Sequence, residues 1–421
     1  MYELTTLENG LRVLTVSVPH VQSVSVGFFL RVGSRCESAS LSGASHFVEH
    51  MFFKGTERRP TARDVADAIE GRGGIFNGST GVESTLLWAK VAAHHLPEAL
   101  DLLSDILLHA TFDPQELDKE RSVIIEEIKY NLDTPDNLVE ILASQLQWPD
   151  HPLGREVAGT AETVASLSRE ALLEYQAGHY LPGLAVLALA GQVQHAQAVD
   201  LARSFLSEWK PGRAPMCAPA PADSRGPRFR LHFKDTEQTH VNFSFSGLQR
   251  GHPDRHALAL LNVVLGGGMR ARLFQQVRET LGLAYSIDSY VDLFEDAGAF
   301  GVYAGVAPEA ADRAIRAILG ELDRLRQEAI PDDELEKAKE FSKGRLALAL
   351  EDPFAQASWY ARQELLGPEV LDPEAVIAAQ DRVESQEIQR LAQALFRPDR
   401  MNLALVGPTH DDDQFREAVR F

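Results

Sequence analysis

The sequence predicts an α+β fold made of two homologous domains, each a mixed or antiparallel sheet covered by helices. Three observations support this prediction. Strand-like and helix-like segments cluster separately, a proline-rich segment nearly bisects the 421 residues, and the two halves carry the same order of segments. Clustered strands beside clustered helices are typical of α+β layers.

The first half supplies the pattern of elements. We expect strands where β-branched and apolar residues alternate or run together, and helices where apolar residues recur every three to four positions. The chain begins with two strands joined by a turn at Asn9-Gly10, a frequent hairpin dipeptide. Strands are expected near residues 11–18, 22–32, 74–78 and 83–91, and helices near residues 44–54, 62–71, 95–109 and 115–131.

The second half repeats this order. The strand THVNFSFSGLQRG precedes the helix DRHALALLNVVLGG, as the strand SVSVGFFLRVGS precedes the helix near residue 44. The segment VAPEAADRAIRAILGELDRLRQEAIPDDELEKAKE repeats the helix, break, proline and helix start of VAAHHLPEALDLLSDILLHATFDPQELDKE. A period of about 215 residues is too long for a solenoid and indicates an internal duplication.

A linker separates the two copies. The segment KPGRAPMCAPAPADSRGP holds five prolines and has no hydrophobic period, as an extended linker does. We therefore expect a first domain at residues 1–209, a linker at 210–227 and a second, homologous domain at 228–421.

Composition and charge argue against several classes of protein. The net charge of −20 disfavours nucleic-acid binding, because phosphate contacts need Lys and Arg. No run of about 18 apolar residues is present, so no membrane-spanning helix is expected, and the N-terminus lacks the pattern of a signal peptide. Cys36 and Cys217 lie far apart in unlike settings, so we expect neither a disulfide nor a thiolate zinc site. The expected compartment is a reducing cytoplasm.

The segment GASHFVEHMFFKGT carries three titratable side chains on an otherwise apolar helix. Such groups are costly to bury without partners. His46 and His50 are four residues apart and lie one turn above each other, so their imidazoles can hold one zinc ion. Glu49 is close enough to act as a general base on a metal-bound water.

A third ligand is needed, because a catalytic zinc takes three protein ligands and keeps one position for water. The helix expected in DPQELDKERSVIIEEIKYNLD is the best source. Glu120 and Glu127, seven residues apart, fall on its apolar stripe, whereas Glu126 falls on the solvent side. Buried carboxylates must be paired or metal-bound, so we expect Glu127 to be the third ligand and Glu120 to orient a ligand histidine. The stripe is defined by Leu117, Val123, Ile124 and Ile128.

A simpler explanation competes with the metal hypothesis. The H-x-x-E-H pattern arises by chance in a chain of this length with odds of roughly a few per cent. A single histidine on an apolar face is usually a core residue whose ring nitrogens are hydrogen-bonded within the protein. The triple with two further buried glutamates favours a metal. The second half has no H-x-x-E-H, and Arg345 stands near the position of Glu127, so the repeated fold does not require these residues.

At these residues the chain resembles the pitrilysin family of zinc peptidases, the inverzincins, in particular its mitochondrial-processing-peptidase-like branch. The resemblance covers essentially the whole chain. It implies that His46, His50 and Glu127 bind one zinc ion per chain, that Glu49 is catalytic, and that Glu120 is the family's second carboxylate.

The resemblance also implies a substrate-binding segment beside the zinc. GGIFNGSTGVEST, residues 73–85, is similar to the family's segment that binds the substrate backbone. Phe76 and Asn77 are the expected substrate-binding residues in it, and Asn77 matches an asparagine near the catalytic water.

A second substrate-binding segment is implied in the second half. LGGGMRARLFQQVRETLGLAYS is similar to the family's glycine-rich loop, helix and strand, and its Arg278 and Tyr285 match a substrate-binding pair. Without the resemblance these two residues read as a surface arginine and a strand tyrosine. The glycines at 266–268 are expected to form a tight turn, because no Lys-Ser/Thr follows for phosphate binding.

The implied activity is that of a zinc-dependent endopeptidase acting on extended peptides or unfolded segments in a clamshell chamber of two chains. The partner is a second copy or a related chain, with no nucleic acid or membrane involved. The alternatives are a non-catalytic scaffold or partner subunit of the same family, a processor of targeting peptides, and a structural zinc site, which usually closes with four protein ligands. Manganese and cobalt also accept these N and O ligands.

Overall fold

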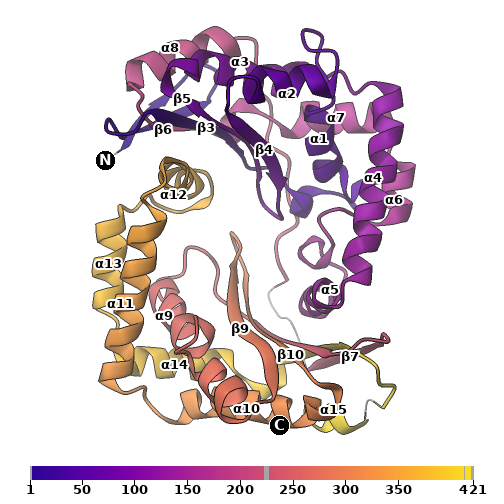
Figure 1. Cartoon of the computed structure of the whole chain (residues 1–421), viewed down its shortest axis with the longest axis vertical. Helices are drawn as coiled ribbons and strands as arrows, with labels where there is room; N and C mark the ends of the chain where they lie inside the picture. The colour runs from indigo at the N-terminus through magenta and orange to yellow at the C-terminus, as the bar shows by residue number, and fades with distance from the viewer. Residues whose placement is uncertain (1, 222–226, 412, 419–421) are drawn as a thin grey trace. The chain divides into compact units, whose positions relative to one another are not determined.

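The computed structural model describes residues 2–221, 227–411 and 413–418. Its contacts divide the chain into two compact units, each with one sheet and covering helices, so the predicted α+β class is confirmed (Figure 1). Neither unit is continuous in sequence. Unit 1 comprises Met1–Ile128, Glu156–Ala218 and Leu348–Asp372, and unit 2 comprises Lys129–Arg155, Pro219–Ala347 and Pro373–Phe421.

The sheet of unit 1 has six strands in the order β1-β2-β6-β3-β5-β4. β2 and β6 are parallel, and all other neighbouring pairs are antiparallel. The first two strands form the predicted hairpin, with Gly10 at a φ of 90°. Because β4 is an edge strand, one side of its backbone is open for pairing. The strands are β1 (Tyr2–Thr6), β2 (Arg12–Ser17), β3 (Ser23–Leu30), β4 (Ile75–Thr80), β5 (Thr85–Ala92) and β6 (Ala185–Gly191).

Helices cover both faces of this sheet. α2, α3 and α8 contact one face, and α12 contacts β6, β3 and β2 on the other (Figure 1). The helices of unit 1 are α1 (Ala44–Phe52), α2 (Ala62–Glu70), α3 (Leu96–His109), α4 (Pro114–Asp133, extending into unit 2), α6 (Ala161–Ser166), α7 (Arg169–His179), α8 (His195–Leu206) and α12 (Pro353–Leu366).

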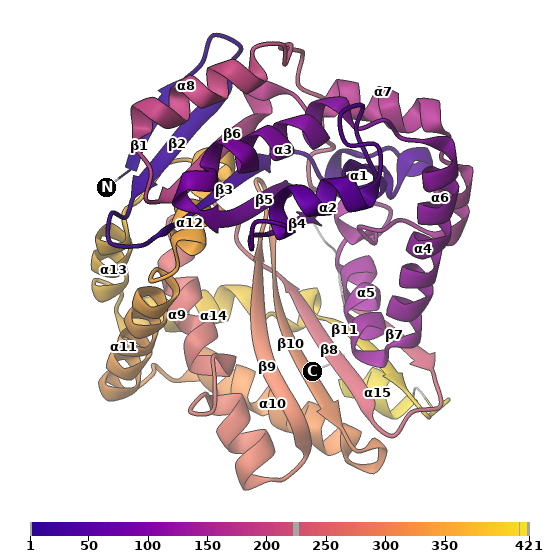
Figure 2. The same cartoon turned by 45° about the horizontal axis from the view of Figure 1, so that its top comes forward.

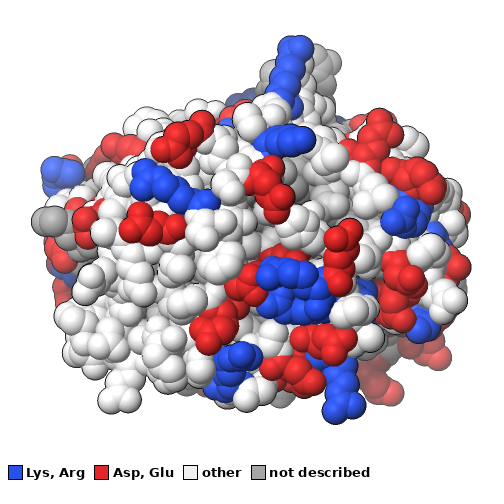
Figure 3. Space-filling view, turned by 90° about the horizontal axis from the view of Figure 1, so that it is seen from above, with Lys and Arg blue, Asp and Glu red and all other residues white. Residues whose placement is uncertain are grey.

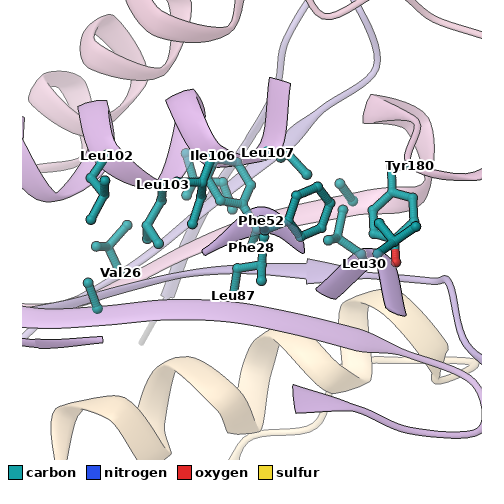
Figure 4. Packing of buried hydrophobic residues seen from close by; sticks show 14 of the residues in the cluster. Val26, Phe28, Leu30, Phe52, Leu87, Leu102, Leu103, Ile106, Leu107 and Tyr180 are labelled. Carbon is teal, nitrogen blue, oxygen red and sulfur yellow. The ribbon is translucent and has the colours of Figure 1, made fainter. Parts of the chain in front are cut away.

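The main core of unit 1 lies between the sheet and α3. Alternate residues of β3 and β5 point to this side and meet the apolar stripe of α3, and Phe52 of α1 joins them (Figure 4). Each of these residues is shielded from solvent. The alternating apolar positions of the strands and the apolar stripe of α3 therefore face the same core. The residues in view include Val26, Phe28, Leu30, Leu87, Leu102, Leu103, Ile106 and Leu107.

The sheet of unit 2 repeats the topology of unit 1. Its order is β7-β11-β8-β10-β9, and only β7 and β11 are parallel. This order and direction match β2-β6-β3-β5-β4, so the internal duplication predicted from the sequence is present in the fold. Figure 2 shows these strands side by side. The strands are β7 (Arg228–Phe233), β8 (Thr239–Ser246), β9 (Ala284–Leu293), β10 (Gly298–Val306) and β11 (Asn402–Gly407).

The helices of unit 2 follow the same plan. α9 comes after β8 as α1 comes after β3, and α10 comes after β10 as α3 comes after β5. Their core includes Phe243, Phe245 and Phe300, with Phe396 packed edge-on against the last two. The helices are α5 (Pro135–Gln147), α9 (Arg255–Gly266), the π-helix η6 (Phe274–Thr280), α10 (Ala311–Gln327), α11 (Asp332–Ala349), α13 (Pro373–Asp381), α14 (Ser385–Leu395) and α15 (Asp413–Ala418).

Two helices are exchanged between the halves of the sequence. α5 comes from the first half but packs on β8 and β11 of unit 2, where Leu138, Val139 and Leu142 meet Ala404 and Val406. α12 comes from the second half but packs on the sheet of unit 1. Its Tyr360 and Ala361 join an apolar cluster with residues of β2, β3, β5 and β6.

The exchange makes the compact units differ from the contiguous ranges 1–209 and 228–421. Sequence periodicity identifies a helix but not the sheet on which it packs, so the exchange has no local signal. Residues 210–221 of the predicted linker form neither helix nor strand, and its residues 222–226 lie outside the described part of the chain.

The two cysteines are bonded to each other, so the expectation of no disulfide was wrong. Cys36 and Cys217 have a Cα–Cα distance of 4.4 Å despite a separation of 181 residues. The linker runs back along unit 1 and brings them together, and the Arg35 guanidinium donates to the Ala218 carbonyl at 3.3 Å beside the bond. The cysteines therefore give no argument for a reducing compartment.

The surface carries charges of both signs. On the face in Figure 3, Lys and Arg side chains lie beside Asp and Glu side chains, with uncharged areas between them. Among the described residues, no helix combines the length and apolar character needed to cross a membrane.

Candidate metal centre

Helix α1 presents the three motif residues on the side turned away from the core. Its other side carries Phe47, Val48, Met51 and Phe52, all fully buried. The helix begins after Gly43, whose φ is 94°. A Cβ at Gly43 would lie 2.6 Å from the Ala158 carbonyl oxygen, so only glycine fits there.

The start of α1 is fixed by a buried carboxylate. Glu37 accepts hydrogen bonds from the backbone N–H groups of Gly43 at 2.8 Å and Ser45 at 2.7 Å. This cap satisfies two donors that a helix N-terminus leaves unpaired, and its negative charge suits the helix dipole. The orientation of the motif helix therefore depends on residues preceding it.

Helix α4 brings two glutamates to α1. Leu117, Ile124 and Ile128 are buried as predicted, whereas Val123 is 49% exposed and was wrongly assigned to the stripe. The predicted stripe was too wide: Val123 lies at its margin, and the side chain of Glu127, which was expected to be buried, is 42% exposed. Arg121 anchors the helix by donating to the carbonyls of Val164 and Leu167.

The ligand atoms predicted from the sequence converge. His46 Nε2 lies 3.8 Å from Glu127 Oε1, and His50 Nε2 lies 3.7 Å from Glu127 Oε2. The donor atoms of the three residues all lie within 4.8 Å of one another, the only such group of three or more His, Cys, Asp or Glu residues in the described part of the chain.

These separations fit a small metal ion. Zinc bonds of 2.0–2.1 Å in a tetrahedron separate neighbouring ligand atoms by about 3.3 Å. Two imidazoles and one carboxylate leave one position open, which is the arrangement of catalytic rather than structural zinc.

The second glutamate orients one imidazole. Glu120 Oε2 lies 2.9 Å from His50 Nδ1, and Lys54 Nζ lies 2.7 Å from Glu120 Oε1. A proton on Nδ1 leaves the Nε2 lone pair facing Glu127. Burial raises the pKa of Glu120, but the bonds from Lys54 and His50 outweigh it and hold that pKa below its ordinary value. Glu120 is therefore a carboxylate, as a histidine-orienting group should be.

Burial also favours the neutral form of the His46 imidazole. It lowers the pKa of His46 to about 4, with the neighbouring charge of His50 as a smaller cause. The neutral imidazole is the form that binds metals. His46 Nδ1 is buried and has no hydrogen-bond partner among the described residues.

Glu49 lies beside the three candidate ligand residues, but its carboxylate is bonded to a residue of β4. It is buried, and its Oε2 accepts a hydrogen bond from the Thr80 hydroxyl at 2.5 Å. Burial raises the pKa of Glu49, and the Thr80 hydrogen bond and the His50 charge oppose that rise.

The expected substrate-binding residues of β4 divide between the two faces of the sheet. Phe76 points to the side of α1, where its ring lies 5.6 Å from that of Phe53. Since side chains alternate along a strand, Asn77 points to the opposite face and its Oδ1 accepts from the Gly78 N–H at 2.8 Å. Asn77 is exposed there and has no hydrogen bond to Glu49 in the described part of the chain.

Arg278 and Tyr285 are brought together in unit 2. The Arg278 guanidinium lies 4.7 Å from the ring centre of Phe274 and 5.6 Å from that of Tyr285. Arg278 lies in the π-helix η6, a rare geometry that is frequent at functional sites. Tyr285 is 74% exposed at the start of β9.

Sequence reasoning missed three residues near the metal centre. Lys54 follows the motif in FFKGT, and Thr80 shares a strand face with Phe76; both positions could have been found by extending the helix and strand periods. Glu156 could not, because it stands alone in HPLGREVAG. Burial raises its pKa, with the charge of Glu127 as a smaller cause.

Comparison with known proteins identifies the family. Residues 12–161 match the profile described as "Insulinase (Peptidase family M16)", and residues 166–341 match "Peptidase M16 inactive domain". The chain is 37% identical over 413 residues to the "Uncharacterized zinc protease YmxG" of Bacillus subtilis, covering 97% of this chain and 99% of that protein. The chain belongs to peptidase family M16. The pitrilysin-family resemblance predicted from the sequence is thus confirmed.

Solved structures share this M16 fold. A protease from Helicobacter pylori has a TM-score of 0.91 at 23% identity, covering 97% of this chain and 99% of that one. A chain of "Complex III2 from Candida albicans, Inz-5 bound" has a TM-score of 0.85 at 20% identity and covers 99% of both chains. At such identities the likeness concerns the fold.

Proposed function

We propose that this M16 protein is a zinc-dependent endopeptidase that hydrolyses extended peptides or unfolded segments. The observation that carries the proposal is the convergence of His46, His50 and Glu127 to within 4.8 Å, with Glu49 one residue from a ligand. Homologues that cover nearly the whole chain and are named zinc proteases support the peptidase class.

The residues present fit one zinc ion per chain. When bound, the metal lowers the pKa of a water molecule and polarises the scissile carbonyl. His46, His50 and Glu127 would hold it, and Glu120 orients the His50 ring through its contact with Nδ1. Manganese and cobalt suit the same N and O donors, so metal identity is part of the test.

Glu49 is the proposed catalytic base and acid. Its carboxylate is not needed as a ligand, because the other three residues complete a catalytic set. In the proposed reaction it takes one proton from the attacking water and returns a proton to the leaving amine. This use accounts for a buried carboxylate that has only one hydrogen-bond donor among the described side chains, the Thr80 hydroxyl.

The peptide would dock along the open edge of β4. Strand addition uses backbone hydrogen bonds at Gly74–Asn77, so it requires an extended chain and admits many sequences. Phe76 and Phe53 offer an aromatic surface on the side of α1. Arg278 and Tyr285 would donate hydrogen bonds to substrate carbonyls or to the developing oxyanion.

We further propose that two chains form the working peptidase, as a homodimer or with a related chain. Arg278 and Tyr285 would then serve the metal centre of the partner. Mixing Glu49→Gln chains with Tyr285→Phe chains tests this arrangement, because mixed dimers then contain one intact pair of sites. Recovery of activity above both parents is expected, and absence of recovery would exclude action in trans.

A second candidate is a non-catalytic scaffold or partner subunit. The match of residues 166–341 to a profile named for an inactive domain favours it, as does the fold shared with a chain of Complex III2. Retention of the three ligand residues and Glu49 argues for catalysis instead.

The deciding experiment is cleavage of a mixed peptide pool, read by mass spectrometry. Zinc-loaded wild type should cut peptides, Glu49→Gln should cut none, and Glu70→Gln, which changes an exposed glutamate on α2, should match the wild type. Equal cleavage by wild type and Glu49→Gln would refute the role of Glu49. No cleavage by any of the three would favour the non-catalytic subunit.

A further inference from the structure

The Thr80 hydroxyl is the single hydrogen-bond donor to the Glu49 side chain among the described residues. It reaches Oε2 at 2.5 Å from the last residue of β4. Hydrogen bonds from a hydroxyl to a carboxylate are short and strong compared with those between neutral groups. None of the described residues donates a hydrogen bond to the other oxygen, Oε1.

The strand geometry explains why Thr80 reaches this carboxylate. Phe76, Gly78 and Thr80 share one face of β4, two residues apart, and all three adjoin residues of α1 or its end. At Gly78 an added Cβ would lie 2.9 Å from Glu49 Oε1, so the strand backbone passes directly behind the carboxylate. Glu49 is thus bounded by Gly78 and held by Thr80.

The Thr80 hydroxyl is itself directed by its surroundings. Its oxygen lies 3.5 Å from the Thr85 hydroxyl, whose own proton is donated to the Val32 carbonyl at 2.9 Å. Thr85 is fully buried. The proton of Thr80 has Glu49 Oε2 as its acceptor.

We propose that Thr80 is a positioning residue for Glu49. Its hydroxyl fixes Oε2 and so leaves Oε1 as the oxygen that exchanges protons with water and the leaving amine. A glutamate side chain has three rotatable bonds, and a base that is displaced by about 1 Å loses about 100-fold in rate. This inference rests on the proposed function, because it assigns Thr80 a part in the same reaction.

The test compares three variants with the wild type. Thr80→Val removes the hydroxyl at nearly constant shape, Thr80→Ser keeps it, and Ser207→Ala removes an exposed hydroxyl at the end of α8, outside the proposed binding segments. For each, kcat and KM are measured on one peptide that the wild type cleaves, and bound zinc is measured by mass spectrometry. Zinc content reports on the metal centre independently of activity.

The expected pattern is specific to positioning. Thr80→Val should lower kcat about 10- to 100-fold with little change in KM or zinc content. Thr80→Ser should restore most of kcat, and Ser207→Ala should match the wild type. Loss of zinc by Thr80→Val, or failure of Thr80→Ser to recover kcat, would overturn the inference in favour of a structural role.

Failure of the inference is separable from failure of the proposed function. If the wild type cleaves peptides and Thr80→Val has the same kcat, only the role of Thr80 is refuted. Wild type that cleaves nothing overturns both.

Discussion

Replacing Glu120 with glutamine should weaken zinc binding although Glu120 is not a ligand. In the wild type, its two oxygens accept from two different donors, His50 at 2.9 Å and Lys54 at 2.7 Å. Glutamine has the same shape but only one acceptor oxygen. Its NH₂ group would face either the Lys54 ammonium or the His50 N–H, donor against donor.

The magnitude follows from these two contacts. A hydrogen bond to a charged group contributes about 1.5–3 kcal/mol, and loss of a group that orients a metal-binding histidine typically costs 10- to 100-fold in affinity. Since each factor of ten corresponds to about 1.4 kcal/mol, the two estimates agree. The zinc dissociation constant of Glu120→Gln should therefore rise about 10- to 100-fold.

Competition with a fluorescent zinc chelator at fixed pH measures this constant directly. The matched control is Glu116→Gln, one turn earlier on α4, where a half-buried glutamate pairs with the exposed Lys119 at 2.5 Å. Exposed pairs contribute about 0–1 kcal/mol, and this one does not touch a ligand, so zinc affinity should not change. Equal affinity of Glu120→Gln and wild type would refute the view that Glu120 orients His50.

Three further predictions concern other parts of the molecule. The buried Asp105 carboxylate is bonded to Arg58 and Arg59, and although burial raises its pKa, these bonds and one from a threonine hold the pKa below its ordinary value. Because the pKa of Asp105 is lower in the folded state, the stability that its bonds contribute is fully present above the unfolded-state pKa of about 3.9. This contribution is lost as the pH falls through the pKa of the folded state. Urea unfolding should thus show Asp105→Asn less stable by about 1–3 kcal/mol at pH 7, with a smaller difference near pH 3; a constant difference would contradict the pKa argument. Reduction of the disulfide should lower the free energy of unfolding by about 2–5 kcal/mol, read as a lower thermal midpoint, and Cys36→Ser should be insensitive to reductant. Arg278→Ala should reduce kcat/KM about 10- to 100-fold with unchanged zinc content, and an unaltered kcat/KM would exclude it from substrate binding.

The residues of the candidate metal centre were predictable because they recur at helical spacings in the sequence. The spacing of His46 and His50 defines one face of one helix, and the seven-residue spacing of Glu120 and Glu127 defines one face of another. The structure brings these four residues together. Only the meeting of the two helices required tertiary information.

Other features could not be predicted because they depend on distant packing. The bond between Cys36 and Cys217 requires the linker to return along unit 1, and no pattern near either cysteine indicates that path. Val123 lies at the edge of an apolar stripe, where helical period alone does not separate a buried position from an exposed one. The position of Thr80 on the strand face of Phe76 follows from the strand period, but its hydrogen bond to Glu49, 31 residues away in sequence, does not.

The exchange of α5 and α12 has a consequence for synthesis on the ribosome. The strands of unit 1 are complete once β6 has been made, yet α12, which covers their second face, ends at Leu366. At about 5–20 residues per second the ribosome needs roughly 10–30 s to make the intervening chain. In the complete fold α12 covers Leu14, Phe29 and Val186, so during that interval this apolar surface would have no helix over it. We therefore expect nascent unit 1 to be prone to aggregation until the second half of the chain supplies α12.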